Sequence, residues 1–356
     1  MPSAISSPEL FPPLSPEAIL AFQFSSWYPR FSHLSMKSTV IRPLSQEFKE
    51  YLDAEGVFLP EGSEDAPLQS SLSDHEDDDE HEDDQEERRK FSFPELDAKI
   101  REAVTKYGAV FPKLNFSSPR DAAWMLPASS PLKCVSPADV YLLLKSSDYV
   151  LHDLDPDRVF EETEPSSEAD KAAYELELVL RKWYPVDHSR ELRCFVRRET
   201  LIGITQRDPN YYDFWNERDT QEKVLEAIKS FWQQNIKGKW EATGGNYVFD
   251  FLLTRDLTRG HIVDFNPYAP KTDPLLFTYE ELLERLNEAG SQSHFEPELR
   301  VIDSRSHPAA TRNAPAHQHN MVPIEALAMS QGRTMQEFAQ SWQEEIRRSA
   351  VESDEE

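Results

Sequence analysis

The chain has 356 residues, enough for one large or two modest domains. Its formal net charge is −27, from 65 acidic and 38 basic residues, so we do not expect a nucleic-acid-binding face. The two cysteines, Cys134 and Cys194, lie far apart in the sequence and fit a reduced interior without a disulfide framework. No apolar run is long enough to cross a membrane and no signal-peptide pattern opens the chain, so a soluble intracellular protein is expected.

Three stretches are predicted to lie outside the folded body: a disordered N-terminus at 1–20, a disordered acidic linker at 61–90 and a mostly disordered tail at 303–356. The N-terminus is rich in Ser and Pro. Within the linker, residues 74–87 contain eleven acids, and like charges at this density repel and cannot bury a core. The linker is either a solvating loop or an arm that attracts a basic partner.

The first half of the folded body is predicted to mix helices and short strands. An aromatic cluster at 22–31 should anchor that segment onto a core, because each ring buries a large area. The other expected elements are an extended segment at 38–44, a short helix at 47–52, a helix at 94–107, a strand at 109–116, a helix from 118 through 124, a helix at 137–145, a strand at 149–151 and an exposed loop at 153–170.

Lys113 lies near the end of a predicted strand, just before the start of a predicted helix. Ser118 would cap that helix, with Pro119 at its first position. A lysine beside a helix N-terminus is a natural phosphate site. A lone lysine there could equally be an ordinary surface residue, which is the simpler interpretation when this residue is considered alone.

The second half is predicted to be rich in strands. The expected elements are strands at 174–180, 191–197 and 201–208, a helix at 221–234, a hairpin formed by 246–253 and 260–267, a helix from Thr278 to Leu286 that opens with a Thr-x-x-Glu capping box, and an extended segment at 295–302. No glycine-rich phosphate loop, paired-cysteine motif or Gly-x-Ser-x-Gly elbow occurs in the sequence.

The hairpin carries the main chemical signal. If its turn is centred near Leu257, Asp250 lies opposite Asp264, while Ile262, Asp264 and Asn266 share one face by strand alternation. Two carboxylates placed across a strand pair repel, and burial raises that cost. Mg²⁺ removes the conflict, because it prefers one or two carboxylates together with amide and phosphate oxygens. The alternative is a solvated hairpin face with unrelated aspartates; three converging oxygen-bearing side chains favour the metal.

Other strands also carry charges where a sheet is normally apolar. With the hairpin residues they form one set: Lys113, Arg193, Asp250, Asp264 and Asn266, with Arg181 at a strand end. Such a set supplies cations for phosphate oxygens and oxygens for Mg²⁺, and the neighbouring Trp183 could face an adenine ring. Core salt bridges, for instance Arg193 with Asp250, explain the charges equally well but give no reason for Asn266. From the residues alone both interpretations stay open.

Several segments resemble the cell division cycle protein 123 family. They are residues 111–122, 180–183, 191–196, 206–208 and 263–267, and the likeness covers roughly 22–60 and 91–300. The resemblance implies an α+β, ATP-grasp-like fold that holds ATP and Mg²⁺ between two α+β subdomains. The N-terminal subdomain would comprise 21–60 and 91–175, and the nucleotide- and Mg-binding C-terminal subdomain would comprise 176–302.

The resemblance also implies roles for single residues. Lys113 and Arg193 would hold phosphates, while Asp250, Asp264 and Asn266 would hold Mg²⁺, with Asp-x-Asn in place of the Glu-x-Asn that is common in ATP-grasp ligases. The segment Arg181, Lys182 and Trp183 would lie along the hinge that receives the adenine.

For function, the resemblance implies a cytoplasmic, monomeric ATP-binding chaperone. It would engage the gamma subunit of eukaryotic translation initiation factor 2 and promote joining of the alpha subunit. The alternatives are a carboxylate–amine ligase of ATP-grasp type, for which Arg207 is one carboxylate clamp without an evident second, and an acidic interaction protein with a vestigial pocket. The sequence singles out no catalytic residue and leaves ATP hydrolysis open.

Overall fold

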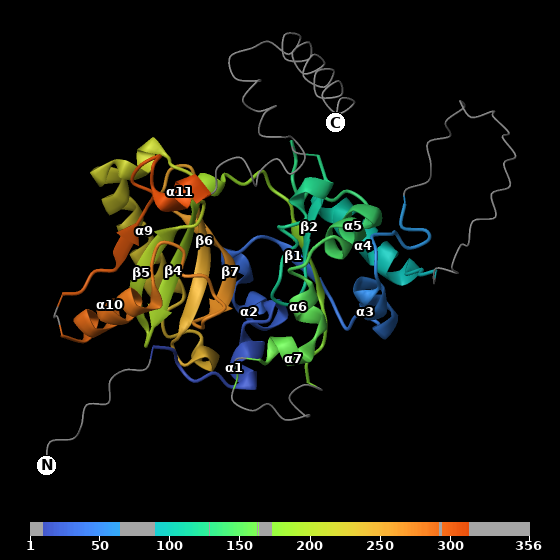
Figure 1. Ribbon diagram of the computed structural model, residues 1–356, viewed down its shortest axis with the longest axis horizontal. Coiled ribbons are helices and arrows are strands. Elements are labelled where there is room, and N and C mark those ends of the chain that lie inside the picture. Colours follow the sequence, from blue (N-terminus) through green and yellow to red (C-terminus); the bar gives the residue numbers. More distant parts are fainter. Residues whose placement is uncertain are drawn as a thin grey trace, which may run out of the picture. The chain divides into compact units, whose positions relative to one another are not determined.

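The computed structural model describes residues 10–64, 90–127, 129–161, 163, 173–291 and 294–312 (Figure 1). The main compact unit comprises the residues up to 208 and 212–301; a second unit comprises 209–211 and the chain from 302 onward, where α11 spans Pro308–Arg312. Predicted linker residues 65–89 and tail residues 313–356 lie outside the described residues. Within those described ranges, no helix is long and apolar enough to span a membrane.

A three-stranded antiparallel sheet in the main unit carries three of the predicted site residues, Lys113, Arg181 and Lys182. Its order is β1 (Ser38–Ile41), β3 (Leu178–Lys182), β2 (Val110–Lys113). Directly paired residues share a face, and β3 pairs Val179 with Lys113 and Arg181 with Phe111. Because residues two apart on a strand also share a face, Lys113 and Arg181 lie on the same side of this sheet.

The opposite face of the first sheet is covered by helices. These are α3 (Gln46–Asp53), α4 (Pro94–Tyr107) and α5 (Pro137–Lys145). Leu178 and Leu180 of β3 pack there with Ile100 of α4 and Val140 of α5 in one core cluster. Since Val179 joins a different core cluster, with residues of the second sheet, the face that carries Lys113 and Arg181 is turned toward that sheet.

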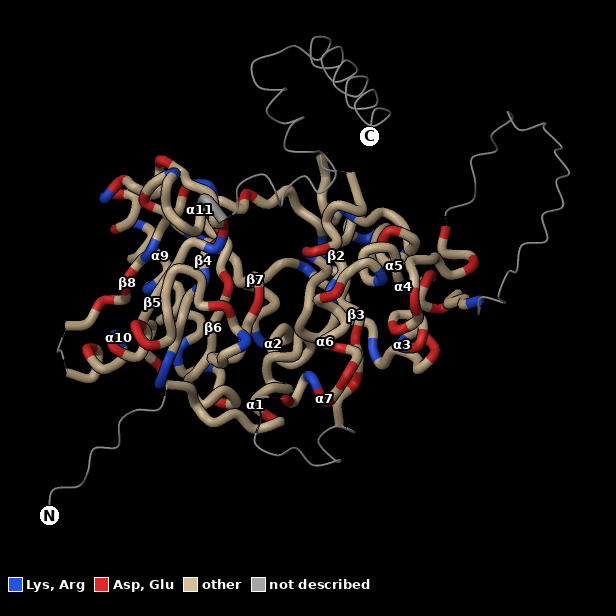
Figure 2. Tube along the Cα trace, in the orientation of Figure 1, with Lys and Arg blue, Asp and Glu red and all other residues tan. Residues whose placement is uncertain are grey.

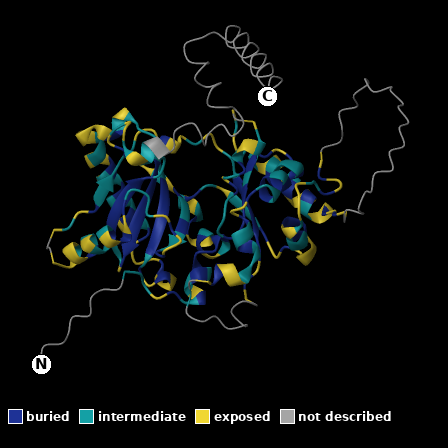
Figure 3. Cartoon of the chain, in the orientation of Figure 1, coloured by how far each residue is buried: buried dark blue, intermediate teal, exposed yellow. Residues whose placement is uncertain are grey.

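The second sheet has five strands in the order β7-β6-β4-β5-β8. The strands are β4 (Glu191–Arg197), β5 (Thr200–Gln206), β6 (Tyr247–Leu253), β7 (Gly260–Pro267) and β8 (Glu298–Arg300). Helix α9 (Arg218–Asn235) packs with Cys194 and Phe249, whereas α10 (Tyr279–Ser291) packs with Phe195 and Val248. The two helices therefore cover opposite faces, and the three central strands, β4, β5 and β6, are almost entirely buried (Figure 3).

The aromatic cluster of the N-terminal segment packs against both sheets. Helix α2 (Phe24–Phe31) buries Phe24, Trp27 and Phe31 almost completely, in the core cluster that also holds Val179 of β3 and Phe265 of β7. The prediction that these rings anchor the segment onto a core is confirmed. In Figure 1, α2 lies between the two sheets.

All three of the predicted disordered stretches contain ordered residues, and in the tail, which was predicted to be mostly disordered, these are the residues of α11. Helix α1 (Pro16–Ala21) lies within the stretch 1–20, and Ile19 is 2% exposed, so the prediction of disorder is wrong for residues 10–20. Ser15 caps this helix by accepting from the amide of Ala18. At the start of the predicted linker, Ser63 is fully buried and donates to the carbonyl of Pro60.

The segment after β2 differs from the prediction in three places. No α-helix forms over 118–124; a single 3-10 turn, Ala123–Met125, stands there, and Asp121 instead accepts from the Ser147 hydroxyl and the Asp148 amide. The predicted strand at 149–151 is wrong, because helix α6 (Leu151–Leu154) begins there. The predicted exposed loop at 153–170 begins with a fully buried Asp153 and helix α7 (Pro156–Val159); residues 162 and 164–170 lie outside the described residues.

The remaining predicted elements are present. They include β1, α3, α4, α5, β4, β5, α9, α10 and a shorter extended piece, β8. The capping box of α10 is also confirmed: the Thr278 amide donates to Glu281 at 2.7 Å, and the Glu281 amide donates to the Thr278 hydroxyl at 3.3 Å. Connecting 3-10 turns lie at His188–Arg190, Asp213–Asn216 and Glu241–Thr243.

Candidate functional site

The β6–β7 hairpin places the three predicted metal ligands on one face of the second sheet. Asp250 on β6 pairs directly with Asp264 on β7, as the predicted hairpin centre requires. Asn266 pairs with Val248, two residues before Asp250, so its side chain lies on the same face. The three side chains therefore share one face of the sheet, as the sequence predicts.

Ile262 does not share this face, contrary to the alternation drawn from the sequence. The register shifts after Asp250, so that Phe251 pairs with Ile262 and Val263 is left as the extra residue of a β-bulge. The bulge turns Ile262 to the opposite face, where it joins the core cluster of Phe265.

Asp250 is held by two arginines. Arg193, its direct partner on β4, makes a bidentate contact, with Nε at 2.8 Å from Oδ1 and Nη2 at 3.0 Å from Oδ2. Nε of Arg207 lies 3.3 Å from Oδ2. Burial works to raise the pKa of Asp250, but the positive charges of Arg193 and Arg207 outweigh it and hold the pKa below its ordinary value. Asp250 is therefore a buried carboxylate that stays ionised.

Asp264 links the two sheets. Its Oδ2 accepts from Nζ of Lys113 on β2 at 2.7 Å, and the lysine side chain is 1% exposed. Oδ1 of Asp264 accepts from the Phe265 amide. Lys113, predicted to bind phosphate, and Asp264, predicted to bind the metal, are thus in direct contact although they are 151 positions apart in the chain.

Arg181 is a buried charged side chain on β3 with donor atoms that make no hydrogen bond to any described residue. It is 2% exposed, and its Nε and Nη2 are buried without a hydrogen-bond partner among the residues that the structure describes. Burial lowers the pKa of Arg181, against the opposing effect of the Asp264 charge. Because a guanidinium stays protonated in proteins, this arginine is a buried cation with unused donors.

Glu191 completes the charged cluster on β4. It accepts from Nη1 of Arg207 at 2.8 Å and from Nδ1 of His188 at 2.9 Å, while Arg120 lies 3.7 Å away. Hydrogen bonding to Glu191 is the largest cause that raises the pKa of His188. Neither Glu191 nor the contact of Arg207 with Asp250 was predicted; strand alternation could have found Glu191, which lies two residues before Arg193 on the same face.

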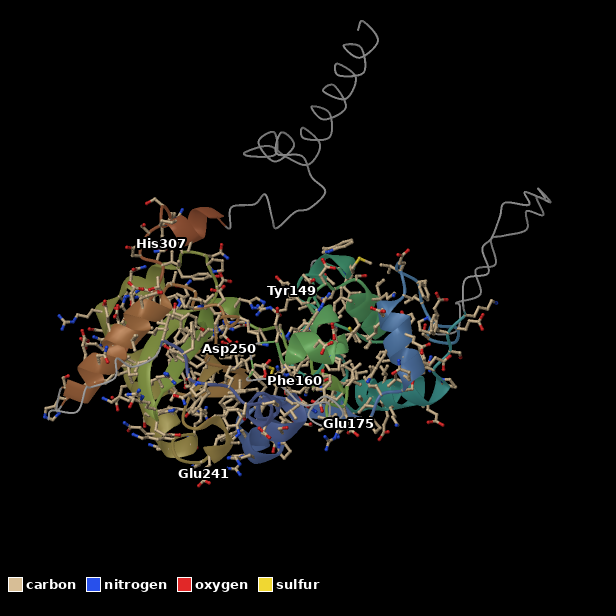
Figure 4. All side chains as sticks on the ribbon, turned by 60° about the horizontal axis from the view of Figure 1, so that its bottom comes forward. Tyr149, Phe160, Glu175, Glu241, Asp250 and His307 are labelled. Carbon is tan, nitrogen blue, oxygen red and sulfur yellow. The ribbon has the colours of Figure 1, made fainter. Side chains whose placement is uncertain are left out.

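We call this group the inter-sheet cluster: Lys113, Arg181, Glu191, Arg193, Arg207, Asp250, Asp264 and Asn266. Figure 2 shows basic and acidic positions close together around β6, β7 and α2. In Figure 4, Asp250 lies on the side of the five-stranded sheet that is turned toward the segment carrying Tyr149 and Phe160. Four cations meet three carboxylates in the cluster, which leaves buried positive charge uncompensated.

Lys182 and Trp183 do not join the cluster, although they follow Arg181 directly. The ammonium of Lys182 lies 5.1 Å from the ring centre of Tyr184. Trp183 donates from Nε1 to the carbonyl of Pro131 at 3.1 Å, and the ammonium of Lys133 lies 5.3 Å from its ring centre. These two side chains line the strand end rather than the charged face.

The hairpin offers oxygens of the kind that Mg²⁺ binds, and both carboxylates accept from cations in this structure: Asp250 from Arg193 and Asp264 from Lys113. In the described part of the chain, no three His, Cys, Asp or Glu side chains gather as a metal site, so the cluster has no all-carboxylate cage. Two carboxylates and one amide do gather, and Mg²⁺ typically takes such a partial set and adds phosphate oxygens. Asn266 has a buried Nδ2 without a partner in the described structure; this nitrogen is a hydrogen-bond donor that suits an acceptor such as a phosphate oxygen, whereas only Oδ1 of the same amide could bind Mg²⁺.

Comparison with known proteins gives consistent matches. A family model described as D123 matches residues 27–330. Relatives named "Translation initiation factor eIF2 assembly protein" include one from Schizosaccharomyces pombe, 35% identical over 338 residues, covering 93% of this chain and 97% of that protein. One from Kluyveromyces lactis is 36% identical over 357 residues, covering 94% of each chain. One from Xenopus tropicalis is 39% identical over 275 residues, covering 75% of this chain and 78% of that protein.

A solved structure described as Cdc123 from Schizosaccharomyces pombe is similar over 82% of this chain and 100% of that one, with a TM-score of 0.62 and 31% sequence identity. This likeness confirms the predicted α+β fold, for which the sequence resemblance implies the ATP-grasp type. The family match, the relatives and the solved structure agree along most of the chain. The chain therefore belongs to the D123 family, which confirms the resemblance of its sequence to the cell division cycle protein 123 family.

Proposed function

We propose that the chain is an ATP-binding assembly factor for eukaryotic translation initiation factor 2. The assembly role is supported by relatives about a third identical over most of the chain whose name states that role. Nucleotide binding is supported above all by one observation, the buried Arg181 with unpartnered donors in a cluster of excess positive charge. A buried cation of this kind is costly unless an anion satisfies it, and a polyphosphate is such an anion.

In this proposal the two sheets contribute different parts of the site. Lys113 and Arg181 from the first sheet and Arg193 from the second contact phosphate oxygens. Asp250, Asp264 and Asn266 hold Mg²⁺, which would neutralise phosphate charge when bound. Lys182 and Trp183, at the end of β3, receive the adenine ring.

The same arrangement suggests how nucleotide could influence a partner. The contacts of Lys113 with Asp264 and of Arg120 with Glu191 already join the two halves of the main unit. A nucleotide that bonds to both sheets stabilises one arrangement of them, by as much as its affinity differs between arrangements. We propose that this arrangement presents the surface that binds the gamma subunit and favours joining of the alpha subunit. The chain would do this as a monomer in the cytoplasm.

A carboxylate–amine ligase is less well supported. That activity needs a basic clamp for the substrate carboxylate, and the sequence offers Arg207 for this role. In the structure Arg207 is bonded to Glu191 at 2.8 Å and lies 3.3 Å from Asp250. An arginine committed to two protein carboxylates is poorly placed to clamp a third from a substrate.

The proposal is tested by capture of the gamma subunit on the immobilised chain, with and without Mg-ATP. We expect capture of gamma by the wild-type chain and, with Mg-ATP present, faster joining of alpha. The double variant Asp264→Ala, Asn266→Ala should bind Mg-ATP at least tenfold more weakly and lose the effect of nucleotide on alpha joining. Failure of the wild-type chain to retain gamma would refute the assembly role, and ADP release that requires both an acid and an amine would establish the ligase instead.

A further inference from the structure

One aromatic ring lies beside both cations of the first sheet. Nζ of Lys113 is 5.3 Å from the centre of the Phe24 ring, and the guanidinium carbon of Arg181 is 5.5 Å from the same centre. Phe24 itself is fully buried. An aromatic ring attracts cations to its negative π-face where water is excluded, and Tyr28 stacks on the same ring with 4.8 Å between the ring centres.

The ring matters most for Arg181. Lys113 has the Asp264 carboxylate at 2.7 Å, whereas Nε and Nη2 of Arg181 have no hydrogen-bond partner among the described residues. The Phe24 ring lies beside that guanidinium, and the charge of Asp264 also acts on it. A long side chain without orienting contacts has several rotamers, and fixing it when a ligand binds costs conformational entropy.

The backbone around Phe24 is fixed by residues that flank the two strands carrying the cations: Asn115 follows β2 and Glu177 precedes β3. The Phe24 amide donates to the carbonyl of Asn115, two residues after Lys113. The amide of Ser25, the next residue, donates to Glu177, a buried carboxylate four residues before Arg181. Glu177 also accepts from Gln23 at 2.9 Å, and its own amide donates to Asn115. The start of α2 is thereby held against both strands, with little freedom for the ring to move away.

We propose that Phe24 is a positioning residue of the phosphate site: it holds Lys113 and Arg181 in place, and so sets the affinity of the site for polyphosphate. This inference rests on the proposed nucleotide function. It assigns a binding role to α2, an element outside both sheets, and it predicts that the ring acts through the cations and not through the adenine.

The test compares two buried phenylalanines of the same helix. Phe24→Leu removes the ring beside the cations, and Phe31→Leu removes an equally buried ring that packs on Phe265 and Trp240. Both changes should lower the unfolding midpoint by similar amounts, because both leave a similar gap. We expect calorimetry to show Mg-ATP affinity about tenfold weaker for Phe24→Leu, and within twofold of wild type for Phe31→Leu.

A second readout separates positioning from general loosening. If the ring acts through the phosphate-binding cations, Phe24→Leu should reduce affinity for ATP more than affinity for AMP, which carries fewer phosphate charges. Equal losses for both nucleotides, or an equal effect of the two leucine variants, would refute the positioning role while leaving nucleotide binding in place. No binding of Mg-ATP to the wild-type chain would instead refute the proposed function itself. Should Phe24→Leu not fold, judged by circular dichroism, Phe24→Met serves in its place with the same expectations.

Discussion

At the residue scale, the contact between Lys113 and Asp264 is the ion pair that joins the two sheets, and its lysine is 1% exposed. We expect Lys113→Met to lower the free energy of unfolding by about 3 kcal/mol, because removing one partner leaves the other charge poorly compensated. Urea unfolding monitored by fluorescence measures this difference. Lys229→Met is the matched control: its pair with Glu296 is more exposed, and its loss should cost under about 1 kcal/mol. Equal costs for the two variants would contradict this account of the pair.

His188 gives the chain a stability that depends on pH. Its hydrogen bond to Glu191 raises its pKa above the ordinary value of 6.5, although burial opposes the shift. A raised pKa in the folded state means that the stabilisation is fully present below the unfolded pKa and is lost as pH rises through the folded one. Unfolding of wild type and His188→Gln in urea should therefore differ most near pH 6 and converge at alkaline pH. A difference that grows with pH would show that the bond to Glu191 does not favour the charged imidazole.

Much of the site could be predicted at this scale, because strand alternation and one hairpin centre suffice to place Asp250 opposite Asp264. The unpartnered Arg181 could not be predicted, since whether a side chain finds a partner depends on three-dimensional contacts. The bulge at Val263, which turned Ile262 away, has no glycine or proline to signal it. The sequence allowed two interpretations of the charges, core salt bridges or a site for phosphate and Mg²⁺. The structure contains the salt bridge of Arg193 with Asp250 within the same cluster that would bind the ligand.

At the element scale, the contact between β5 and α10 depends on a residue without a side chain. A Cβ added at Gly203 would lie 2.9 Å from Leu282 and 3.1 Å from the ring of Phe277, both of them buried. We expect Gly203→Ala to lower the free energy of unfolding by about 1–3 kcal/mol through overpacking. Gly290→Ala in α10 meets nothing within 4 Å and should stabilise by about 0.5–1 kcal/mol, because alanine favours the helix. Thermal unfolding should thus shift in opposite directions for the two variants.

Elements with repeated signals were predicted well, and elements with a single local signal were not. Helices α4 and α9 repeat an apolar position every turn, so no one residue decides them. The prediction of a helix over 118–124 depended on a helix-start signal alone. In the structure, the Asp121 carboxylate instead accepts hydrogen bonds from the segment Ser147–Tyr149. The apolar run 149–151 is too short to distinguish a strand from the start of a helix, and helix α6 begins at its last residue, Leu151. In both places tertiary contacts decided the structure.

At the scale of the whole molecule, charges gather on the face of the first sheet that is turned toward the second and on one face of the second sheet. Lys113 and Arg181 come from the first sheet, and Arg193, Asp250 and Asp264 come from the second. The second sheet carries the oxygens proposed for Mg²⁺ and one cation, Arg193, whereas the other two cations proposed to contact phosphate, Lys113 and Arg181, come from the first sheet. Because a ligand at this cluster would bond to both sheets, its binding energy stabilises their arrangement as well as each sheet. Nucleotide binding and partner binding can be coupled through that arrangement.

The measurement that tests this account most directly is calorimetric titration of Mg-ATP into the wild-type chain and into Arg181→Gln. The account predicts that the wild-type chain binds and that the variant, which loses the buried unpartnered cation, binds at least tenfold more weakly. Arg218→Gln is the control, since that arginine is 89% exposed and pairs with Glu222 on its own helix, and it should bind as wild type does. Unchanged affinity in a folded Arg181→Gln variant would contradict the claim that the inter-sheet cluster is a phosphate site.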